Sequence, residues 1–216
     1  MIVVLLGPPG CGKGTQGERL AAALKVPKIS TGDVIRAAMK NGTPLGLQAK
    51  AFYDRGDLVP DTLIMDIIRE TLAAPEQARG VVLDGVVRTT PQAEGLNGVL
   101  TELGRKVDLV LLFEIADEEL VGRLSARVVC EACQSPFMGR QPGERHADCL
   151  KDPKGTLVRR KDDEPEAIRN RLTVYGVQTA PVIGWYREHG ANMKSIAALG
   201  TVDGVTALVN AAAGVA

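Results

Sequence analysis

Residues 7–15 read GPPGCGKGT and directly follow the apolar run IVVLL at residues 2–6. A short apolar run bounded by turn residues is typical of a buried strand in a parallel sheet. The pattern G-x-x-x-x-G-K after such a strand predicts a loop whose backbone N–H groups converge on phosphate oxygens. A helix is predicted to begin near Lys13, whose side chain would bridge the β- and γ-phosphates of a nucleotide. We therefore predict a nucleotide-phosphate loop at the end of the first strand.

The residue after the lysine departs from the usual phosphate-loop pattern, which places Ser or Thr there as a ligand of Mg²⁺. Gly14 follows Lys13 in this chain, and Thr15 comes one position later. We therefore expect Mg²⁺ to be held more by phosphates and water than by the loop. A glycine-rich turn without a ligand is the alternative, which the preceding strand and the lysine disfavour. The loop residues predicted to bind the nucleotide are Gly10, Cys11, Gly12, Lys13, Gly14 and Thr15.

The composition of the 216-residue chain fits one α/β domain with small inserted segments. Lys+Arg and Asp+Glu both number 26, so binding to nucleic acid or membranes through bulk charge is not expected. The apolar N-terminal run is too short for a signal sequence or a membrane span, so we expect a cytoplasmic protein. In a reducing compartment the four cysteines are predicted to be thiols or metal ligands rather than disulfides.

Strand-like and helix-like segments alternate along the chain. Apolar runs at 81–83, 108–115 and 193–199 predict further buried strands, and helical patterns lie between them. This alternation predicts an α/β fold with a parallel sheet and helices on both faces, in which ligands bind beyond the carboxyl ends of the strands. Two segments interrupt the alternation: 31–59 is helical, and 128–163 is rich in Cys, Gly, Pro and charges.

The second of these segments carries a candidate metal site. Cys130-x₂-Cys133 forms one chelating pair, and Cys149-x₂-Asp152 is a plausible second pair. Four tetrahedral S/O ligands favour a structural Zn²⁺, and a short, weakly apolar segment needs such a link to fold. His146-x₂-Cys149 is the competing pair, which we rank behind Asp152. Three unrelated thiols are the remaining alternative.

Five segments make the chain resemble the adenylate kinases, in their long bacterial form with a metal-bearing lid. They are GPPGCGKGTQ (7–16), ISTGDVIRAAM (29–39), LDGVVRTTPQA (83–93), RRKDDEPEAIRNRL (159–172) and TAPVIGWY (179–186). The resemblance implies a P-loop core at 1–29, 60–126 and 164–216, a nucleoside-monophosphate (NMP)-binding domain at 30–59 and a lid at 127–163. It also implies a monomeric nucleoside-monophosphate kinase that converts ATP and AMP reversibly into two ADP with Mg²⁺, by in-line transfer with lid closure. Such an enzyme serves adenine nucleotide homeostasis and salvage.

The resemblance also implies a role for individual residues. On the acceptor side the AMP-binding residues would be Thr31, Arg36, Asp57, Leu58, Val59, Gly85, Val86, Val87, Arg88, Gln92, Arg160 and Arg171. On the donor side the ATP-binding residues beyond the phosphate loop would be Arg123, Arg127, Pro136, Phe137 and Thr201. The residues nearest the transferred group would be Lys13, Asp84, Arg88, Arg123, Arg127, Arg160 and Arg171. The fourth metal ligand of the family is Cys or Asp, which supports Asp152.

The charges agree with this chemistry. Phosphoryl transfer needs in-line positioning and neutralisation of charge rather than a strong base, and an array of arginines supplies both. Asp84 follows a strand, where its carboxylate can orient Mg²⁺ through water; its alternative role is that of a turn residue before Gly85. Asp162 and Asp163 are expected to hold Arg123 or Arg160 when the lid closes, to cap the helix that follows, or to do both.

One segment departs from the family pattern. The family has LDGFPRT where residues 83–89 read LDGVVRT. The bond between Val86 and Val87 is expected to be trans, because a cis bond without proline costs about 3–4 kcal/mol. We therefore expect a loop of different shape or looser packing around Arg88, with weaker AMP binding or a lower rate. Another monophosphate as acceptor and a catalytically inactive nucleotide-binding protein are the alternatives.

Overall fold

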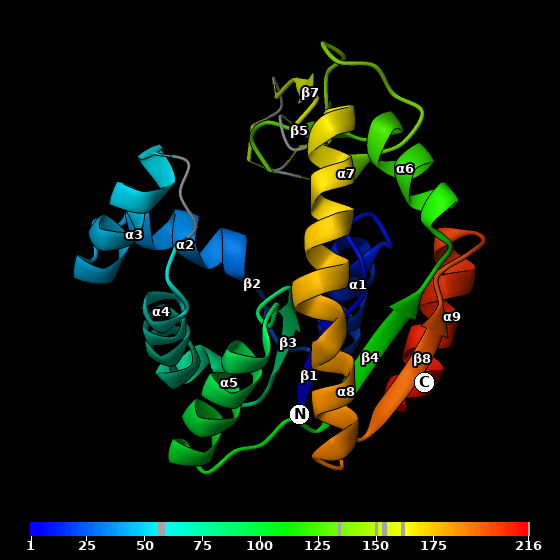
Figure 1. Ribbon diagram of the computed structural model, residues 1–216. Helices are drawn as coiled ribbons and strands as arrows, with labels where there is room; N and C mark the ends of the chain where they lie inside the picture. The colour runs from blue at the N-terminus through cyan, green and yellow to red at the C-terminus, as the bar shows by residue number, and fades with distance from the viewer. Residues whose placement is uncertain (56–58, 134, 150, 153–154, 161–162, 216) are drawn as a thin grey trace.

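The computed structural model describes residues 1–55, 59–133, 135–149, 151–152, 155–160 and 163–215. Its centre is a sheet of five parallel strands in the order β2-β3-β1-β4-β8 (Figure 1). Leu5 in β1 pairs with Asp84 in β3 and with Leu111 in β4, so the strands end at a common edge. The predicted parallel sheet is confirmed. Its strands are β1 (Ile2–Leu6), β2 (Lys28–Ser30), β3 (Val81–Asp84), β4 (Leu109–Glu114) and β8 (Met193–Ala197).

Helices pack on both faces of this sheet, as the alternation of elements predicts. Alternate β1 side chains divide between two apolar cores, because successive residues of a strand point to opposite faces. Val4 belongs to the core shared with α4, α5 and α8, and Val3 belongs to the core shared with α1, α6 and α9. The helices are α1 (Lys13–Leu24), α4 (Asp61–Ala73), α5 (Thr90–Glu102), α6 (Asp117–Ala126), α8 (Ala180–Glu188) and α9 (Val202–Ala213).

The helical insertion contains α2 (Thr31–Lys40) and α3 (Pro44–Arg55), which pack on the first half of α4. Ala49, Leu63 and Ile67 form the buried centre of this small core. The core is separate from the two that cover the sheet, and α2 and α3 stand away from the sheet in Figure 1. The insertion is thus attached to the sheet mainly through β2 and α4.

Residues 127–163, which the resemblance predicts to be a lid and which we call the lid segment, carry a second sheet of three short antiparallel strands in the order β6-β5-β7. They are β5 (Val128–Cys130), β6 (Pro136–Phe137) and β7 (Leu157–Val158). The buried apolar cluster of this sheet consists of Val128, Cys130, Cys149 and Leu157. Two of these four residues are cysteines, so the cluster offers little hydrophobic area to stabilise the lid segment by itself.

A long helical column leads from the lid segment along the sheet (Figure 1). It consists of α7 (Pro165–Val174), a π-helical turn at Tyr175–Thr179 and α8. In a π-helical turn the hydrogen bonds run from residue i to i+5, so the turn holds more residues than an α-helical turn. Val182 and Tyr186 anchor α8 in the sheet core, whereas α7 contacts α6.

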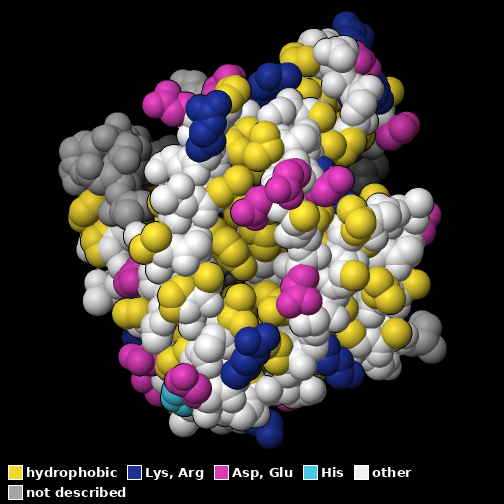
Figure 2. Space-filling view, turned by 45° about the vertical axis from the view of Figure 1, so that its right-hand side comes forward, with side chains coloured by type: hydrophobic (Ala, Val, Ile, Leu, Met, Phe, Trp, Pro, Cys, Tyr) yellow, Lys and Arg dark blue, Asp and Glu magenta, His cyan; other side chains and the backbone are white. Residues whose placement is uncertain are grey.

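Charged side chains of both signs share the face of the molecule shown in Figure 2. Lys and Arg side chains are interspersed with Asp and Glu on the face shown in Figure 2, in keeping with the formal net charge of zero. Within the described part of the chain, no helix combines the length and the apolar character that a membrane span requires.

Candidate active site

The phosphate loop connects β1 to α1 as the sequence predicts. Gly7 has a φ of 146°, and a Cβ there would lie 2.8 Å from the Phe113 carbonyl oxygen, so only glycine fits. Gly12, with a φ of 99°, precedes the first turn of α1. The first N–H groups of a helix have no partner within the helix, so α1 directs free donors and its positive dipole end at the loop. The loop is therefore built to receive an anion.

Lys13 lies folded over this loop. Its Nζ donates hydrogen bonds to the carbonyl oxygens of Gly7 (2.7 Å) and Pro8 (2.8 Å) and lies 3.5 Å from the Cys11 Sγ. These contacts hold the ammonium group at the loop before any nucleotide arrives. They also give Cys11, which is buried, a packing role.

Asp84 stands beside the loop at the carboxyl end of β3. A Cβ added to Gly14 would lie 3.6 Å from the Asp84 Oδ2. The usual hydroxyl ligand of Mg²⁺ is missing from position 14, and the structure brings a carboxylate to the same place from the neighbouring strand. Thr15 lies in the first turn of α1 and is half-buried.

The two valines that replace the family pattern lie in the core. Val86 is 1% exposed and Val87 is 2% exposed, both in the cluster shared with α4, α5 and α8. The described residues contain no cis peptide bond, so the expected trans bond is confirmed. Both side chains are buried in this core, and the expected difference in loop shape or packing around Arg88 stays a prediction. Ligand contacts at these two positions would therefore fall to the backbone.

Thr31 fixes the start of the same loop. Its Oγ1 donates a hydrogen bond of 2.7 Å to the carbonyl oxygen of Gly85, which has a φ of 64°. Thr31 is the first residue of α2, so this bond ties the helical insertion to the carboxyl end of β3. The exposed Arg88 side chain also donates to the Gly85 carbonyl, through Nε at 3.3 Å. The structure thus brings Thr31, Gly85 and Arg88 together as predicted.

Gln92 and Asp61 hold the other end of this loop. The Arg88 backbone N–H donates to the Gln92 Oε1 at 2.7 Å, and the Gln92 Nε2 donates to the Asp61 Oδ1 at 2.7 Å. The Thr89 hydroxyl donates to the Asp61 Oδ2 at 3.0 Å. The sequence does not reveal this role of Asp61, because nothing local links it to Gln92, 31 positions away.

Some of the predicted positions lie wholly or partly outside the described residues. Asp57 and Leu58 lie outside the described residues, and so does Asp162. The backbone of Arg36 lies in α2, but its side chain is outside the description. Val59 is half-buried and packs against the small core of the helical insertion.

Asp163 holds two of the predicted arginines. The Arg127 Nε and Nη2 donate to the Asp163 Oδ2 and Oδ1 at 2.8 and 2.6 Å, and the Arg171 Nη1 donates to Oδ1 at 3.1 Å. Asp163 is 0% exposed, and the bidentate geometry is the strongest form of such a pair. The partners of Asp163 are thus Arg127 and Arg171 rather than the expected Arg123 or Arg160, because Asp163, at the end of the lid segment, faces the ends of α6 and α7.

The remaining predicted site residues differ in their surroundings. Arg123 lies in the last turn of α6 and is half-buried, as is Arg160. Phe137 packs edge-on against the His146 ring, with centroids 4.7 Å apart, while its neighbour Pro136 is exposed. Thr201 caps α9, because its Oγ1 accepts a hydrogen bond of 3.1 Å from the Gly204 N–H.

The lid segment gathers four potential metal ligands. The ligand atoms of Cys130, Cys133, His146 and Cys149 all lie within 4.8 Å of one another. The Cys133 Sγ is 3.4 Å from the His146 Nδ1, and the Cys130 Sγ is 3.7 Å from the Cys149 Sγ. Among the described residues this group does not include Asp152. The cluster thus contains His146, the competing ligand, whereas the described contact of Asp152 is a hydrogen bond of 3.4 Å from its backbone N–H to the Cys149 Sγ.

The thiols of this group differ in acidity. Burial raises the pKa of the Cys130 thiol above its ordinary value. Burial acts in the same direction on Cys133, but hydrogen bonds with Ser135 and the neighbouring thiols outweigh it and lower the pKa of Cys133 to about 6. Three sulfurs and one imidazole nitrogen in a compact group form a donor set that suits tetrahedral Zn²⁺. The residues present thus fit the expected metal.

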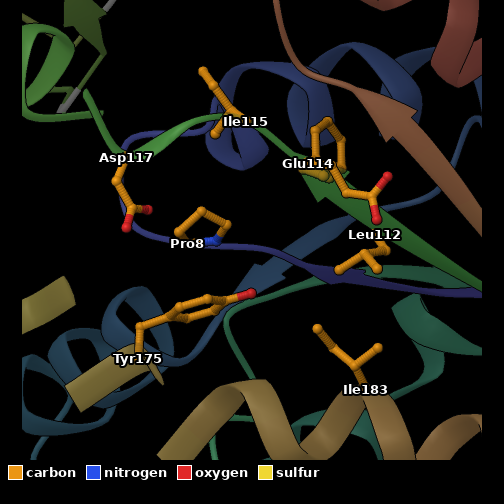
Figure 3. Close-up of a pocket in the computed structure, with 8 residues that line it drawn as sticks. Pro8, Leu112, Glu114, Ile115, Asp117, Tyr175 and Ile183 are labelled. Carbon is orange, nitrogen blue, oxygen red and sulfur yellow. The ribbon is translucent and has the colours of Figure 1, made fainter. Parts of the chain in front are cut away.

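A cavity of about 220 Å³ adjoins the phosphate loop at the end of β4. The hydroxyl of Tyr175 points into the space between Pro8 and Leu112 in Figure 3, and Asp117 lies at the rim. Burial, and to a smaller extent Cys11 and Glu114, raise the pKa of Tyr175 to about 12, so its hydroxyl keeps its proton at neutral pH. The lining residues are Pro8, Leu112, Phe113, Glu114, Ile115, Asp117, Tyr175 and Ile183.

Comparison with known proteins agrees with the architecture. A family model described as "Adenylate kinase" matches residues 5–191. An adenylate kinase of Gemmatimonas aurantiaca is 66% identical over 206 residues, which cover 95% of each chain. Adenylate kinases of Geobacter sp. (43% over 205 residues, 95% of each chain) and Syntrophobacter fumaroxidans (40% over 215 residues, 99% of this chain and all of the relative) are also similar. Because the family model and these relatives cover nearly the whole chain, including the phosphate loop and the arginine-bearing segments, the protein belongs to the adenylate kinase family.

Proposed function

We propose that this kinase catalyses the reversible, Mg²⁺-dependent transfer of a phosphoryl group from ATP to AMP, which yields two ADP. The observation that carries the proposal is the meeting of Lys13, Asp84 and the Thr31–Gly85–Arg88 contacts at one edge of the sheet. The names of the similar proteins support the same reaction. Adenine nucleotide homeostasis and salvage follow as its role.

The donor side of this proposal uses the phosphate loop. N–H groups of residues 10–15 would bind the ATP phosphates, and Lys13 would exchange its two carbonyl partners for phosphate oxygens. Mg²⁺ would neutralise charge on the transferred group, and Asp84 would orient it through water. Arg123 and Arg127 would approach the phosphates from α6, and Pro136, Phe137 and Thr201 would border the adenine.

The acceptor side uses the loop between β3 and α5. Thr31, Gly85, Arg88 and Gln92 are the proposed AMP contacts for which the structure describes mutual bonds. Arg160 and Arg171 would reach the transferred group and the AMP phosphate. Residues 36, 57–59, 86 and 87 complete the proposed set, with positions 86 and 87 contributing backbone only.

Lid closure completes the proposed mechanism. We divide the chain into a core at 1–29, 60–126 and 164–216, an NMP-binding domain at 30–59 and a lid at 127–163. Closure would exclude water, which is a competing acceptor, and bring the lid arginine Arg160 onto the phosphates. The Arg127–Asp163 pair supports this division, because it joins the two ends of the lid segment.

A coupled assay tests the proposed reaction. ADP formation is measured with ATP and AMP in the presence of Mg²⁺, then with GTP as donor and with UMP, CMP or GMP as acceptor. The highest kcat/KM is expected for the ATP and AMP pair. A higher kcat/KM for another monophosphate would replace AMP in the proposal, and no turnover with any pair would overturn the enzymatic role.

We further propose that Cys130, Cys133, His146 and Cys149 hold a structural Zn²⁺ that takes no part in the chemistry. Replacing His146 by Ala is expected to abolish the zinc content and lower the melting temperature of the lid segment, because a weak apolar core then remains alone. The matched variant Asp152→Ala is expected to retain about one Zn²⁺ per chain. Metal analysis and calorimetry measure both. Zinc retained in His146→Ala but lost in Asp152→Ala would show that Asp152, not His146, is the fourth ligand.

The family pattern at positions 86 and 87 offers a second test of the acceptor side. The double substitution Val86→Phe with Val87→Pro is expected to raise kcat/KM for AMP. Because Val86 is fully buried, the larger phenylalanine ring is also expected to cost about 1–3 kcal/mol of stability through overpacking. Steady-state kinetics and thermal unfolding measure the two effects separately. An unchanged kcat/KM for AMP would show that the valines do not limit the acceptor site.

A monomeric state stays a prediction from the family resemblance, and a cytoplasmic location stays a prediction from the N-terminal sequence. The cofactors and partners that the proposal names are Mg²⁺, structural Zn²⁺, ATP, AMP and ADP, without nucleic acid or membrane.

A further inference from the structure

Asp61 lies at the first residue of α4 and uses both of its carboxylate oxygens. Oδ1 accepts from the Gln92 Nε2 at 2.7 Å, and Oδ2 accepts from the Thr89 hydroxyl at 3.0 Å. Thr89 is the N-cap of α5, because its Oγ1 accepts from the Gln92 backbone N–H at 3.3 Å. One carboxylate thus joins the start of α4 to the start of α5.

The charge of Asp61 decides how the Gln92 amide is oriented. An ionised carboxylate only accepts hydrogen bonds, so the Gln92 Nε2 must face it. The Gln92 Oε1 then faces the opposite way, where it accepts from the Arg88 backbone N–H at 2.7 Å. Reversing the amide would place an oxygen against the carboxylate and an NH₂ group against an N–H. Gln92 is only 4% exposed, so water cannot easily replace these partners.

We propose that Asp61 is a positioning residue of the acceptor site, which acts on AMP through Gln92 and the Arg88 backbone. The inference rests on the proposed AMP contacts of Arg88 and Gln92. Asp61 holds the Gln92 amide in one orientation and, through it, the backbone position from which the Arg88 side chain reaches the phosphate. It makes no contact with the phosphate loop among the described residues, so its effect is confined to the acceptor.

Substitutions of Asp61 are expected to change KM for AMP much more than KM for ATP. Asp61→Ala is expected to raise KM for AMP about tenfold or more, because the buried Gln92 amide loses a charge-assisted partner, and to leave KM for ATP within twofold. Asp61→Asn is expected to raise KM for AMP less than alanine does, since its Oδ1 still accepts from the Gln92 Nε2. The control Asp66→Ala removes a carboxylate of the same helix that pairs only with Arg69 among its described partners.

The test is a bisubstrate kinetic analysis of these variants, with thermal unfolding of each to set a temperature at which all are folded. Asp61→Ala with an unchanged KM for AMP, or with equal increases for AMP and ATP, would overturn the inference. Arg88→Ala, measured in parallel, separates the two levels of the proposal. If Arg88→Ala raises KM for AMP and Asp61→Ala does not, only the role of Asp61 fails. If neither raises it, the proposed acceptor site fails as well.

Discussion

Replacing Lys13 by Met is expected to lower kcat/KM for the reaction of ATP with AMP about a thousandfold. Methionine keeps the length of the side chain but removes the ammonium group that the Gly7 and Pro8 carbonyls hold over the phosphate loop. Preorganised charges that meet the developing charge of phosphoryl transfer commonly contribute this much, and a thousandfold change corresponds to about 4 kcal/mol of the barrier. Steady-state kinetics at saturating Mg²⁺ measure the loss.

Lys106→Met is the matched control for this experiment. Lys106 is exposed and lies before β4, away from the loop, so its replacement removes the same charge without touching the proposed site. Its kcat/KM is expected to stay within twofold of the parent protein. A loss below tenfold in Lys13→Met, or an equal loss in Lys106→Met, would contradict the role given to Lys13.

The second large effect is expected at Asp163. Asp163→Ala leaves the guanidinium groups of Arg127 and Arg171 without the buried carboxylate that orients them. Losing the hydrogen bonds of this carboxylate is expected to cost about 1–3 kcal/mol of stability, because the two guanidinium groups, 18% and 30% exposed, keep some access to water. Misplacing groups that neutralise the transferred phosphoryl is expected to lower kcat about a hundredfold in addition.

Thermal unfolding and kinetics below the melting temperature measure these two losses. The control is Asp148→Ala, which removes an exposed carboxylate from the same lid segment and is expected to change stability by less than about 0.5 kcal/mol. A kcat that stays near the parent value in folded Asp163→Ala would show that Arg127 and Arg171 orient themselves without this residue.

The features that the sequence predicts best are the local ones. The strand at residues 2–6, the loop after it and the helix from Lys13 depend on neighbouring residues, and all three occur where the pattern places them. The parallel sheet follows from repetition of the same unit. Asp84 could also be placed, because the carboxyl ends of adjacent parallel strands meet at one edge.

The features that the sequence did not predict depend on contacts between distant segments. Asp61 at the start of α4 binds Gln92 near the start of α5, and no sequence spacing connects the two residues. The choice between His146 and Asp152 depends on the path of the lid, where the His146 N–H donates to the Gly155 carbonyl at 2.9 Å. The burial of Val86 and Val87 also depends on distant segments, because α4, α5 and α8 supply the core in which both side chains lie.

The π-helical turn between α7 and α8 determines how the two parts of the helical column are rotated relative to each other. Each residue of an α-helix advances the side-chain direction by about 100°, since a turn holds 3.6 residues. The wider turn at Tyr175–Thr179 therefore rotates the side chains of α7 about the helix axis relative to those of α8. Val182 and Tyr186 can stay fixed in the sheet core while Arg171 faces Asp163. Shortening this turn by one residue would rotate Arg171 away from Asp163 by about 100° around the helix axis. The length of the turn therefore determines which side of α7 faces Asp163.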